Sequence, residues 1–401
     1  MKMVDIKLAF NVEDVADAEV VLTYKGIQLT PDENGDYRGP YGDYILTVAL
    51  SGYRCYRSSF SITENDGELV SIEVKLQEAN GAWDGKTLTE PNIEDGVYQI
   101  SNGAELAWFA NYVNNDGKNQ DAVLSADIHL GNYDWTPIGI STSIKYLGTF
   151  NGHGYKVEGI YINRPEDSYL GLFGCIDGAT LKGINVYGSI TGYNYIGGLV
   201  GDMSSATIDK CANFVDVSAS SSAGGIVSYS KNSNISNCFN VGTITGEYSG
   251  GIASYNRDDI VENVFNIGNI EATSEGGAIT SWAGDSNFSN AFAINEYLIT
   301  DGQTTVTEEQ MASGEVAYKL GEAFGQKIGV DPYPVLDGEP VYYDEATGRY
   351  YNLTTGIGDV VSGDATPEYY INLQGVTSET PWQGINIVRM SDGTIRKIVV
   401  K

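Results

Sequence analysis

Histidine is scarce in this sequence: among 401 residues only His129 and His153 occur, 24 positions apart. They cannot form the His-Glu-x-x-His pattern of a zinc protease, in which two imidazoles one helical turn apart hold the metal. The four cysteines show no Cys-x-x-Cys spacing, so a cysteine metal site is not expected either. We predict no metal, no cofactor and no catalytic residue, and we assign His153 to a turn.

Basic residues are also few, and long apolar runs are missing. Lys and Arg number 23 against 53 Asp and Glu, which gives a net charge of −30. This balance disfavours nucleic acid and anionic membranes as partners. No apolar run is long enough for a membrane-spanning helix. The segment 1–20 alternates apolar and acidic residues, unlike a signal peptide, so we expect an exported monomer whose export signal has been removed.

Three domains are predicted from the patterns along the chain. Residues 1–79 contain short alternating strands such as "YILTVALSGY", separated by turns such as "DENGD", which is typical of a β-sandwich. Residues 80–300 contain a helix at 102–115 and then a repeat. Residues 301–401 open with one or two helices within 307–325. A hairpin around "EATG" and further strands with a turn at "SDGT" follow.

The repeat is visible in its glycines. Gly171, Gly198, Gly225, Gly251 and Gly277 follow one another at nearly equal steps of 27, 27, 26 and 26 in sequence number. Each unit holds short apolar strands and no amphipathic helix. A period of this length indicates a stacked solenoid. We therefore predict a right-handed parallel β-helix with one coil per repeat, in which the glycines let the backbone pass tight corners where a Cβ would clash.

Two further columns recur with the same period. Asn213, Asn240 and Asn266 predict an amide ladder along the coils, each side chain bonded to the next. Cys211 and Cys238 fall on adjacent coils, about 4.8 Å apart, where a disulfide is possible by distance. Two buried free thiols are the other interpretation, which the parallel side-chain directions favour.

A third column holds the candidate binding residues. Met203, Tyr229, Tyr255 and Trp282 recur at the period of the repeat. Lys231 and Arg257 each follow one of these aromatics by two positions. If exposed, the column forms an aromatic ladder with a basic rim, able to stack on sugar faces or hold a protein side chain. If buried, it is a packing stack.

Carboxylates offer a competing, enzymatic interpretation. Many β-helix proteins cleave polysaccharides with carboxylates on one face of stacked strands. The candidates are Asp202, Asp258, Asp259 and Asp285, which we place in the turn after the glycine block. They do not form a column, because Ser230 and Lys231 stand there in the repeat that begins at Ser222. Solvated turn residues are therefore the favoured interpretation.

Several motifs resemble known families. "LGLFG" and "GGLVG", with the lead-in "AELAWFANYVN" and "YLGTFNGHGYKVEGIYI", resemble the GLUG-type repeats of bacterial cell-surface proteins over about residues 98–300. "GDY" and "SGY" resemble PEGA-like or carboxypeptidase-regulatory sandwiches. "YYINLQG" and "RKIVVK" resemble the tail of secreted proteins of the Bacteroides group.

These resemblances imply an adhesin-like protein, on the cell surface or secreted, that binds a host glycan, a host protein or a polysaccharide without catalysis. A polysaccharide lyase or glycoside hydrolase is the first alternative to this function. A purely structural spacer of the cell envelope is the second.

Overall fold

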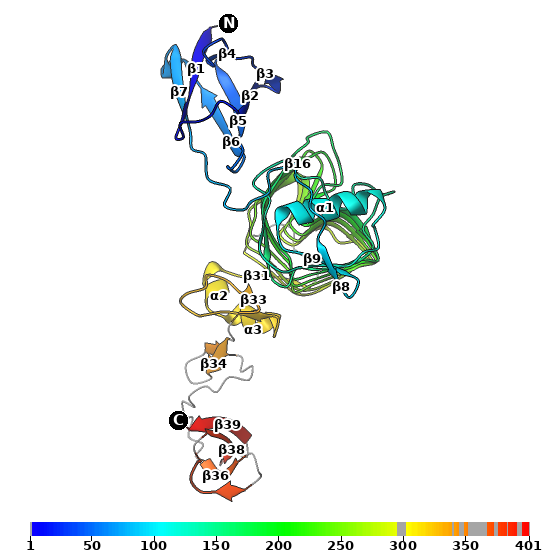
Figure 1. Cartoon of the computed structure of the whole chain (residues 1–401). Helices are drawn as coiled ribbons and strands as arrows, with labels where there is room; N and C mark the ends of the chain where they lie inside the picture. Colours follow the sequence, from blue (N-terminus) through cyan, green and yellow to red (C-terminus); the bar gives the residue numbers. More distant parts are fainter. Residues whose placement is uncertain are drawn as a thin grey trace. The chain divides into compact units, whose positions relative to one another are not determined.

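The computed structural model describes residues 2–294, 302–338, 341–344, 349–351, 367–372, 376–382, 384–390 and 395–400. The chain divides into two units, Met1–Thr305 and Val306–Lys401 (Figure 1). Among the described residues, no helix combines the length and the apolar character that crossing a bilayer requires.

The N-terminal module consists of two small sheets. The first has the order β4-β1-β7, with β1 at Met3–Phe10, β4 at Tyr37–Pro40 and β7 at Leu69–Val74. The second has the order β3-β2-β5-β6, with β2 at Glu19–Tyr24, β3 at Ile27–Gln28, β5 at Gly42–Ala49 and β6 at Tyr56–Ile62. Buried residues alternate along β1 and β5 and join one apolar core, which includes Ile6, Leu22 and Leu46. This is the predicted sandwich, because each sheet buries one face against the other.

A hairpin and a helix begin the solenoid. The hairpin strands are β8 (Asn92–Glu94) and β9 (Val97–Ile100), and α1 spans Gly103–Asn115, as its apolar spacing predicted. The Asn102 side chain accepts a hydrogen bond from the Glu105 backbone N–H at 3.1 Å, and Glu105 accepts one from the Ser101 N–H at 2.7 Å. These bonds satisfy free donors at the start of the helix. The buried face of α1 packs on the solenoid core and covers its first coils (Figure 1).

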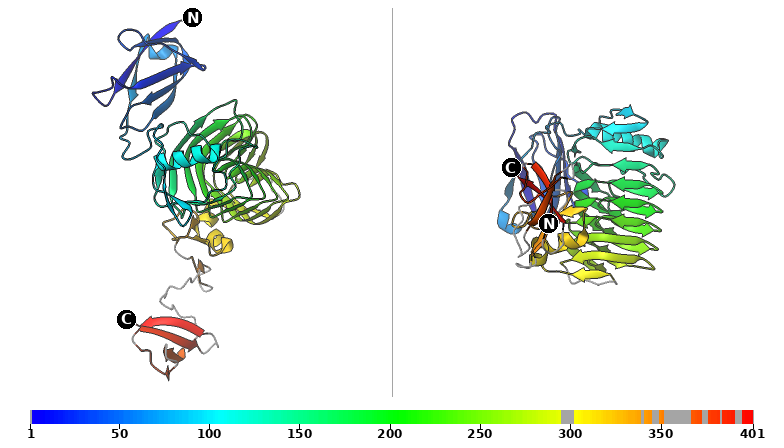
Figure 2. Two further views of the ribbon diagram at one scale, coloured as in Figure 1. Left: turned by 45° about the vertical axis from the view of Figure 1, so that its right-hand side comes forward. Right: turned by 90° about the horizontal axis from the view of Figure 1, so that it is seen from below.

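The solenoid is a parallel β-helix, as the repeat predicted. Strands one coil apart pair in parallel, as Val200 does with Val227 and Val227 with Ala253, and the coils stack in rows (Figure 2). The strands that correspond on successive coils form a closed ladder and a separate five-stranded sheet of order β14-β18-β22-β26-β29. The strands are β10 (Ala122–Leu124), β11 (Ile128–His129), β12 (Thr149–Asn151), β13 (Lys156–Asn163), β14 (Phe173–Asp177), β15 (Thr180–Lys182), β16 (Asn185–Gly192), β17 (Ile196–Gly197), β18 (Val200–Ser204), β19 (Thr207–Asp209), β20 (Ala212–Ala219), β21 (Ser222–Gly224), β22 (Val227–Lys231), β23 (Asn234–Ser236), β24 (Phe239–Asn240), β25 (Ile244–Gly250), β26 (Ala253–Arg257), β27 (Ile260–Asn266), β28 (Ile270–Gly277), β29 (Thr280–Trp282), β30 (Asn287–Ala293) and β31 (Gln303–Thr305).

The repeated glycines serve close packing rather than an unusual backbone angle. Gly198 and Gly225 stand in bends between two strands, as the corner prediction requires, and their φ values are not positive. A Cβ built on Gly198 would lie 2.0 Å from Asn213 Oδ1, and one on Gly225 would lie 2.0 Å from the Gly251 carbonyl oxygen. Only a residue without a side chain fits where the next coil and the asparagine column come this close.

The asparagine column forms the predicted ladder. Asn213 Nδ2 donates to Asn240 Oδ1 at 2.7 Å, and Asn240 Nδ2 donates to Asn266 Oδ1 at 2.7 Å. All three side chains are fully buried. Cys211 and Cys238 are buried free thiols, the second of the two interpretations left open by the sequence. His153 lies in a turn with a φ of 50°, as expected.

The second unit begins with two short helices, α2 at Glu308–Ala312 and α3 at Glu315–Leu320. The capping box at the start of α2 joins Thr307 and Gln310. Antiparallel strands follow, and the "EATG" and "SDGT" turns at 345–348 and 391–394 fall outside the described residues. The strands are β32 (Phe324–Gly325), β33 (Val335–Leu336), β34 (Tyr342–Asp344), β35 (Arg349–Tyr351), β36 (Pro367–Asn372), β37 (Thr377–Ser378), β38 (Gly384–Met390) and β39 (Ile395–Val400).

Candidate ligand-binding site

The predicted aromatic residues lie in register on the five-stranded sheet of the solenoid. Tyr229 on β22 pairs with Tyr255 on β26, which pairs with Trp282 on β29. Successive residues of a strand point to opposite faces. The serines Ser228 and Ser254, which precede the tyrosines, are fully buried, while the rings point outward. Trp282 is 45% exposed and the two tyrosines are half-buried. The column is therefore accessible and is not a packing stack within the core.

The first position of this column was assigned wrongly. Met203 pairs with Ser230, points inward and is fully buried. Its neighbour Asp202 is the register partner of Tyr229, because this coil is one position longer than the coil that leads from Tyr229 to Tyr255. An error of one position moves a side chain to the other face of a strand. Asp202 therefore lies on β18 at the end of the aromatic column, and its assignment to a turn was also wrong.

A second tyrosine column, which the sequence reasoning missed, lies beside the first. Tyr169 and Tyr195 stack with ring centroids 5.2 Å apart, and Tyr195 meets Tyr229 edge to face at 5.6 Å. On the later coils, the ring centroid of Tyr248 lies 5.7 Å from that of Tyr255, which in turn lies 6.2 Å from that of Trp282. The signal was present, since these tyrosines stand two residues before the glycines of "YLG", "YIG" and "YSG". Tyr169, Tyr195, Tyr229, Tyr248, Tyr255 and Trp282 together are called the aromatic face below.

The basic rim forms as predicted by its spacing. Lys231 and Arg257 are register partners on adjacent coils, two residues beyond the tyrosines on the same strands. Arg257 is exposed and its Nε lies 3.8 Å from Asp258 Oδ2, whereas Lys231 makes no ion pair with any described residue. An exposed pair at this distance is weak. Both cations therefore stay available to a ligand beside the aromatic face.

Asp259 supports the turn that carries Arg257. It is buried, and its carboxylate accepts hydrogen bonds from the Ser233 N–H at 2.8 Å, from Asn256 Nδ2 at 2.9 Å and from the Arg257 N–H at 3.2 Å. Burial raises the pKa of this carboxyl group, although these hydrogen bonds lower it in part. Asp259 is thus a structural residue of the turn and not a solvated one, contrary to the expectation.

Asp202 has a different environment. Burial raises its pKa, and the Lys145 ammonium lowers it in part. Lys145 itself is bonded to Asp177 at 3.0 Å. The two perturbed carboxyl groups, Asp202 and Asp259, are separated by two coils, which is roughly 10 Å along the axis alone. Glycosidase pairs lie closer, within about 5–9.5 Å. The separation of these two carboxyl groups therefore does not match that of a glycosidase pair.

Tyr255 adds a hydroxyl group to the aromatic face. Burial raises the pKa of Tyr255 to about 12, with Tyr248 and Glu275 contributing. It stays protonated near neutral pH and can donate a hydrogen bond beside its ring. Within the described residues, no group of three His, Cys, Asp or Glu side chains could hold a metal ion.

No protein-family model matches the chain. A segment is 32% identical over 120 residues to a protein of Evansella cellulosilytica named as a candidate Gly-rich membrane protein. The match covers 25% of this chain and 14% of that protein's length. It therefore leaves most of both chains without a counterpart.

Two solved structures are similar at 14% identity. One is a candidate immunoglobulin A1 protease from Bacteroides ovatus, with a TM-score of 0.38, covering 62% of this chain and 95% of that chain. The other is an IgA1 protease, with a TM-score of 0.33, covering 99% of this chain and 40% of that chain. Both TM-scores are below 0.5, so neither likeness carries a conclusion about this protein.

Proposed function

We propose that this protein is a non-catalytic binding protein, on the cell surface or secreted, that holds a glycan on its aromatic face. The observation that carries the proposal is the register of Tyr229, Tyr255 and Trp282, which places accessible rings on three adjacent coils. Coils are spaced by about 4.8 Å. A chain ligand lying along the solenoid axis would thus meet a ring at each coil.

The chemistry of the face suits sugars. Aromatic rings provide large apolar surfaces with a negative face, against which the C–H bonds of a sugar ring pack. Tyrosine hydroxyls at the ring edges supply hydrogen-bond donors. The side chains are also partly immobilised by their neighbours, as between Tyr195 and Tyr229. Binding therefore orders few new rotamers, which lowers its entropic cost.

The rim adds an electrostatic preference. Lys231 and Arg257 lie at one side of the face and Asp202 lies at its end. A sugar chain that carries acidic groups on the rim side would be favoured over one that carries amines there. We include in this proposal the adhesin-like role that the resemblance to GLUG-type repeats implies.

A glycan array tests the proposal. The full chain and a variant with Tyr229→Ser, Tyr255→Ser and Trp282→Ser are applied to mucin O-glycans and plant polysaccharide fragments. Tyr155→Ser, which removes an exposed ring just before β13 of the solenoid, is the matched control. We expect specific glycans to bind the full chain and the control but not the triple variant. Equal binding by all three proteins would contradict the proposal.

A further inference from the structure

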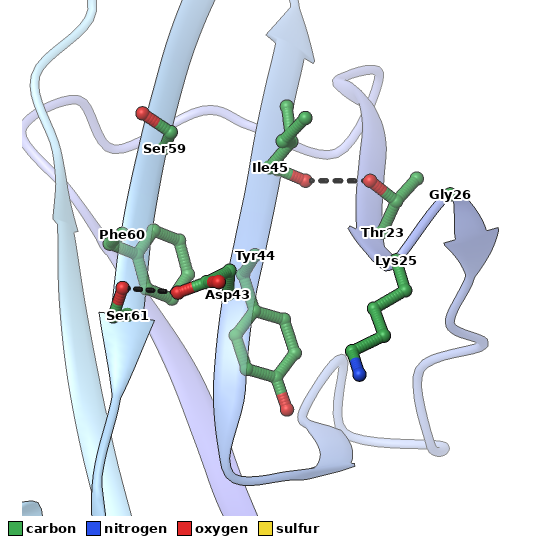
Figure 3. A pocket seen from close by; sticks show the side chains of 9 residues that line it. All are labelled: Thr23, Lys25, Gly26, Asp43, Tyr44, Ile45, Ser59, Phe60 and Ser61. Atoms are coloured by element: carbon green, nitrogen blue, oxygen red, sulfur yellow. Dashed lines mark hydrogen bonds between the residues drawn. The ribbon is translucent and has the colours of Figure 1, made fainter.

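A groove crosses the outer face of the β3-β2-β5-β6 sheet in the N-terminal module. Its volume is about 550 Å³, and Thr23, Lys25, Asp43, Ile45, Ser59 and Ser61 contribute to its walls and floor (Figure 3). A second hollow of about 370 Å³ shares Thr23, Gly26 and Ile45 with it. The two hollows therefore form one continuous groove.

The strand register explains the hollow. Alternate residues of each strand point to the outer face, and they align in rows across the sheet. These rows are Val21, Thr47 and Arg57; then Thr23, Ile45 and Ser59; then Asp43 and Ser61. The floor consists of small hydroxyl or branched side chains, and long side chains stand only at the two ends. Ile45 in the middle row is 44% exposed, so the floor has an apolar centre.

The two ends of the groove are cationic. Lys25 is exposed, and its Nζ lies 5.5 Å from the centroid of the Tyr24 ring. Arg57 is held in place, because Nη1 donates to Thr47 Oγ1 at 3.0 Å and Nε donates to the Asn132 carbonyl oxygen at 3.2 Å. Its guanidinium also lies 3.5 Å from the centroid of the Tyr161 ring. Neither Lys25 nor Arg57 makes an ion pair with a described residue. In a chain with a net charge of −30, two unpaired cations on one groove are a selective feature.

The negative charge of Asp43 does not neutralise either of these cations. Its carboxylate accepts a hydrogen bond from Ser61 Oγ, which turns it toward β6 (Figure 3). The rows of Asp43 and Thr47 are four positions apart on β5, which corresponds to about 14 Å along the strand. The hollow beside Arg57 also contains Asp134 and Arg164, which form an ion pair at 2.7 Å and so offset each other's charge. The groove thus has an unpaired cation near each end and hydroxyl groups between them.

We propose that this groove binds an anionic oligosaccharide. Carboxylate or sulfate groups of the ligand would contact Lys25 and Arg57, and its hydroxyls would bond to Thr23, Thr47 and Ser59. Because Nε and Nη1 of Arg57 already donate within the protein, the N–H groups of Nη2 would bond to an oxygen of such an anion. The site is on a different module from the aromatic face, and it takes its ligand by charge rather than by stacking.

Calorimetric titration of the full chain tests the proposal with three probes. These are a galacturonate hexamer with carboxylates only, a heparin-derived hexasaccharide with sulfates, and uncharged maltohexaose. We expect at least one anionic probe to bind, more weakly at about 0.2 M than at about 0.05 M salt, and maltohexaose not to bind. The anionic probe that binds more tightly identifies the preferred acidic group.

Variants locate the site. Lys25→Gln and Arg57→Gln should each weaken anion binding by at least about fivefold. Lys75→Gln, which removes an exposed charge beside β7 that is paired with Glu73, should leave it unchanged. Because Arg57 also contacts the solenoid, Lys25→Gln is the decisive change, and Lys25→Arg should restore binding. Absence of binding by both anionic probes would overturn the proposal, as would unchanged affinity in Lys25→Gln.

The triple variant of the aromatic face distinguishes the two sites. It should bind the anionic probe as the full chain does. Loss of anion binding in that variant would assign the anion to the aromatic face and refute the groove.

Discussion

Gly198 and Asn213 are packed so closely that a Cβ on Gly198 would lie 2.0 Å from Asn213 Oδ1. The same oxygen accepts a hydrogen bond from the Val215 N–H at 3.1 Å, and Asn213 Nδ2 donates to the next asparagine of the ladder. The glycine column and the asparagine column are therefore one structural device. The absence of a side chain at the glycine leaves room for a buried amide that links adjacent coils.

Gly198→Ala should destabilise the solenoid by about 1–3 kcal/mol, because the added methyl group overpacks this contact. The loss should be smaller in an Asn213→Ala background, where the amide is gone. Guanidinium unfolding of the two single variants, the double variant and the parent protein measures the coupling free energy. Additivity within about 0.5 kcal/mol would show that the two residues do not interact.

Asn240→Ala should lower the free energy of unfolding more than a surface change does. Asn240 bonds to both Asn213 and Asn266, and each buried polar group left unsatisfied costs about 1–3 kcal/mol. Asn234→Ala on β23 removes an exposed amide and is the control, with an expected effect within about 0.5 kcal/mol. Equal effects of the two changes in thermal or guanidinium unfolding would refute the structural role of the ladder.

The protein should lose stability at alkaline pH. Burial raises the pKa of the Cys175 thiol to about 12 and that of Cys238 well above its usual value. A group with a raised pKa in the folded state binds more protons there than in the unfolded state, so the free energy of unfolding falls as pH rises. The window lies between the ordinary thiol value of 9.0 and about 12.

Guanidinium unfolding at several pH values between 9 and 12 measures this loss. The Cys175→Ala variant should show a shallower decline than the parent protein, because one of the buried thiols is removed. Parallel curves for the two proteins would be the contrary result.

Asp202→Tyr should extend the aromatic column by one coil. Asp202 is the register partner of Tyr229, so the new ring would lie beside it. An added aromatic contact is worth about 0.5–1.5 kcal/mol, or roughly a two- to tenfold gain in affinity for the glycan found on the array. Asp202→Asn removes the charge without adding a ring and should give no such gain. A similar gain in both variants would assign the effect to charge.

The repeat period could be read from the sequence because each coil needs the same glycine and the same inward-facing residues. The sandwich, helix α1 and the asparagine ladder were predicted for the same kind of reason, since each has a local pattern. The exact phase of a strand is harder to predict. The length of a coil changes by one position along the solenoid, which is why Met203 was placed where Asp202 lies.

Contacts between the two aromatic columns could not be predicted, because the repeat period shows which residues stack within one column but not which columns lie side by side. Tyr195 precedes β17 and Tyr229 lies on β22 of the next coil, so only the stacking of the coils brings their rings to 5.6 Å. The groove of the N-terminal module depends on the register of three strands. No repeat or motif in the sequence links Lys25 to Arg57, although the strand register places them at the two ends of the same groove.

The most direct test of the central claim is the dissociation constant of the best array glycan for the full chain and for Trp282→Ala, measured by calorimetry. We expect Trp282→Ala to weaken binding by about tenfold, equivalent to about 1.4 kcal/mol, and Trp282→Phe to retain part of the affinity. Circular dichroism and the melting temperature confirm that the variants remain folded. An unchanged dissociation constant in Trp282→Ala and in the triple variant would contradict a ligand site on the aromatic face.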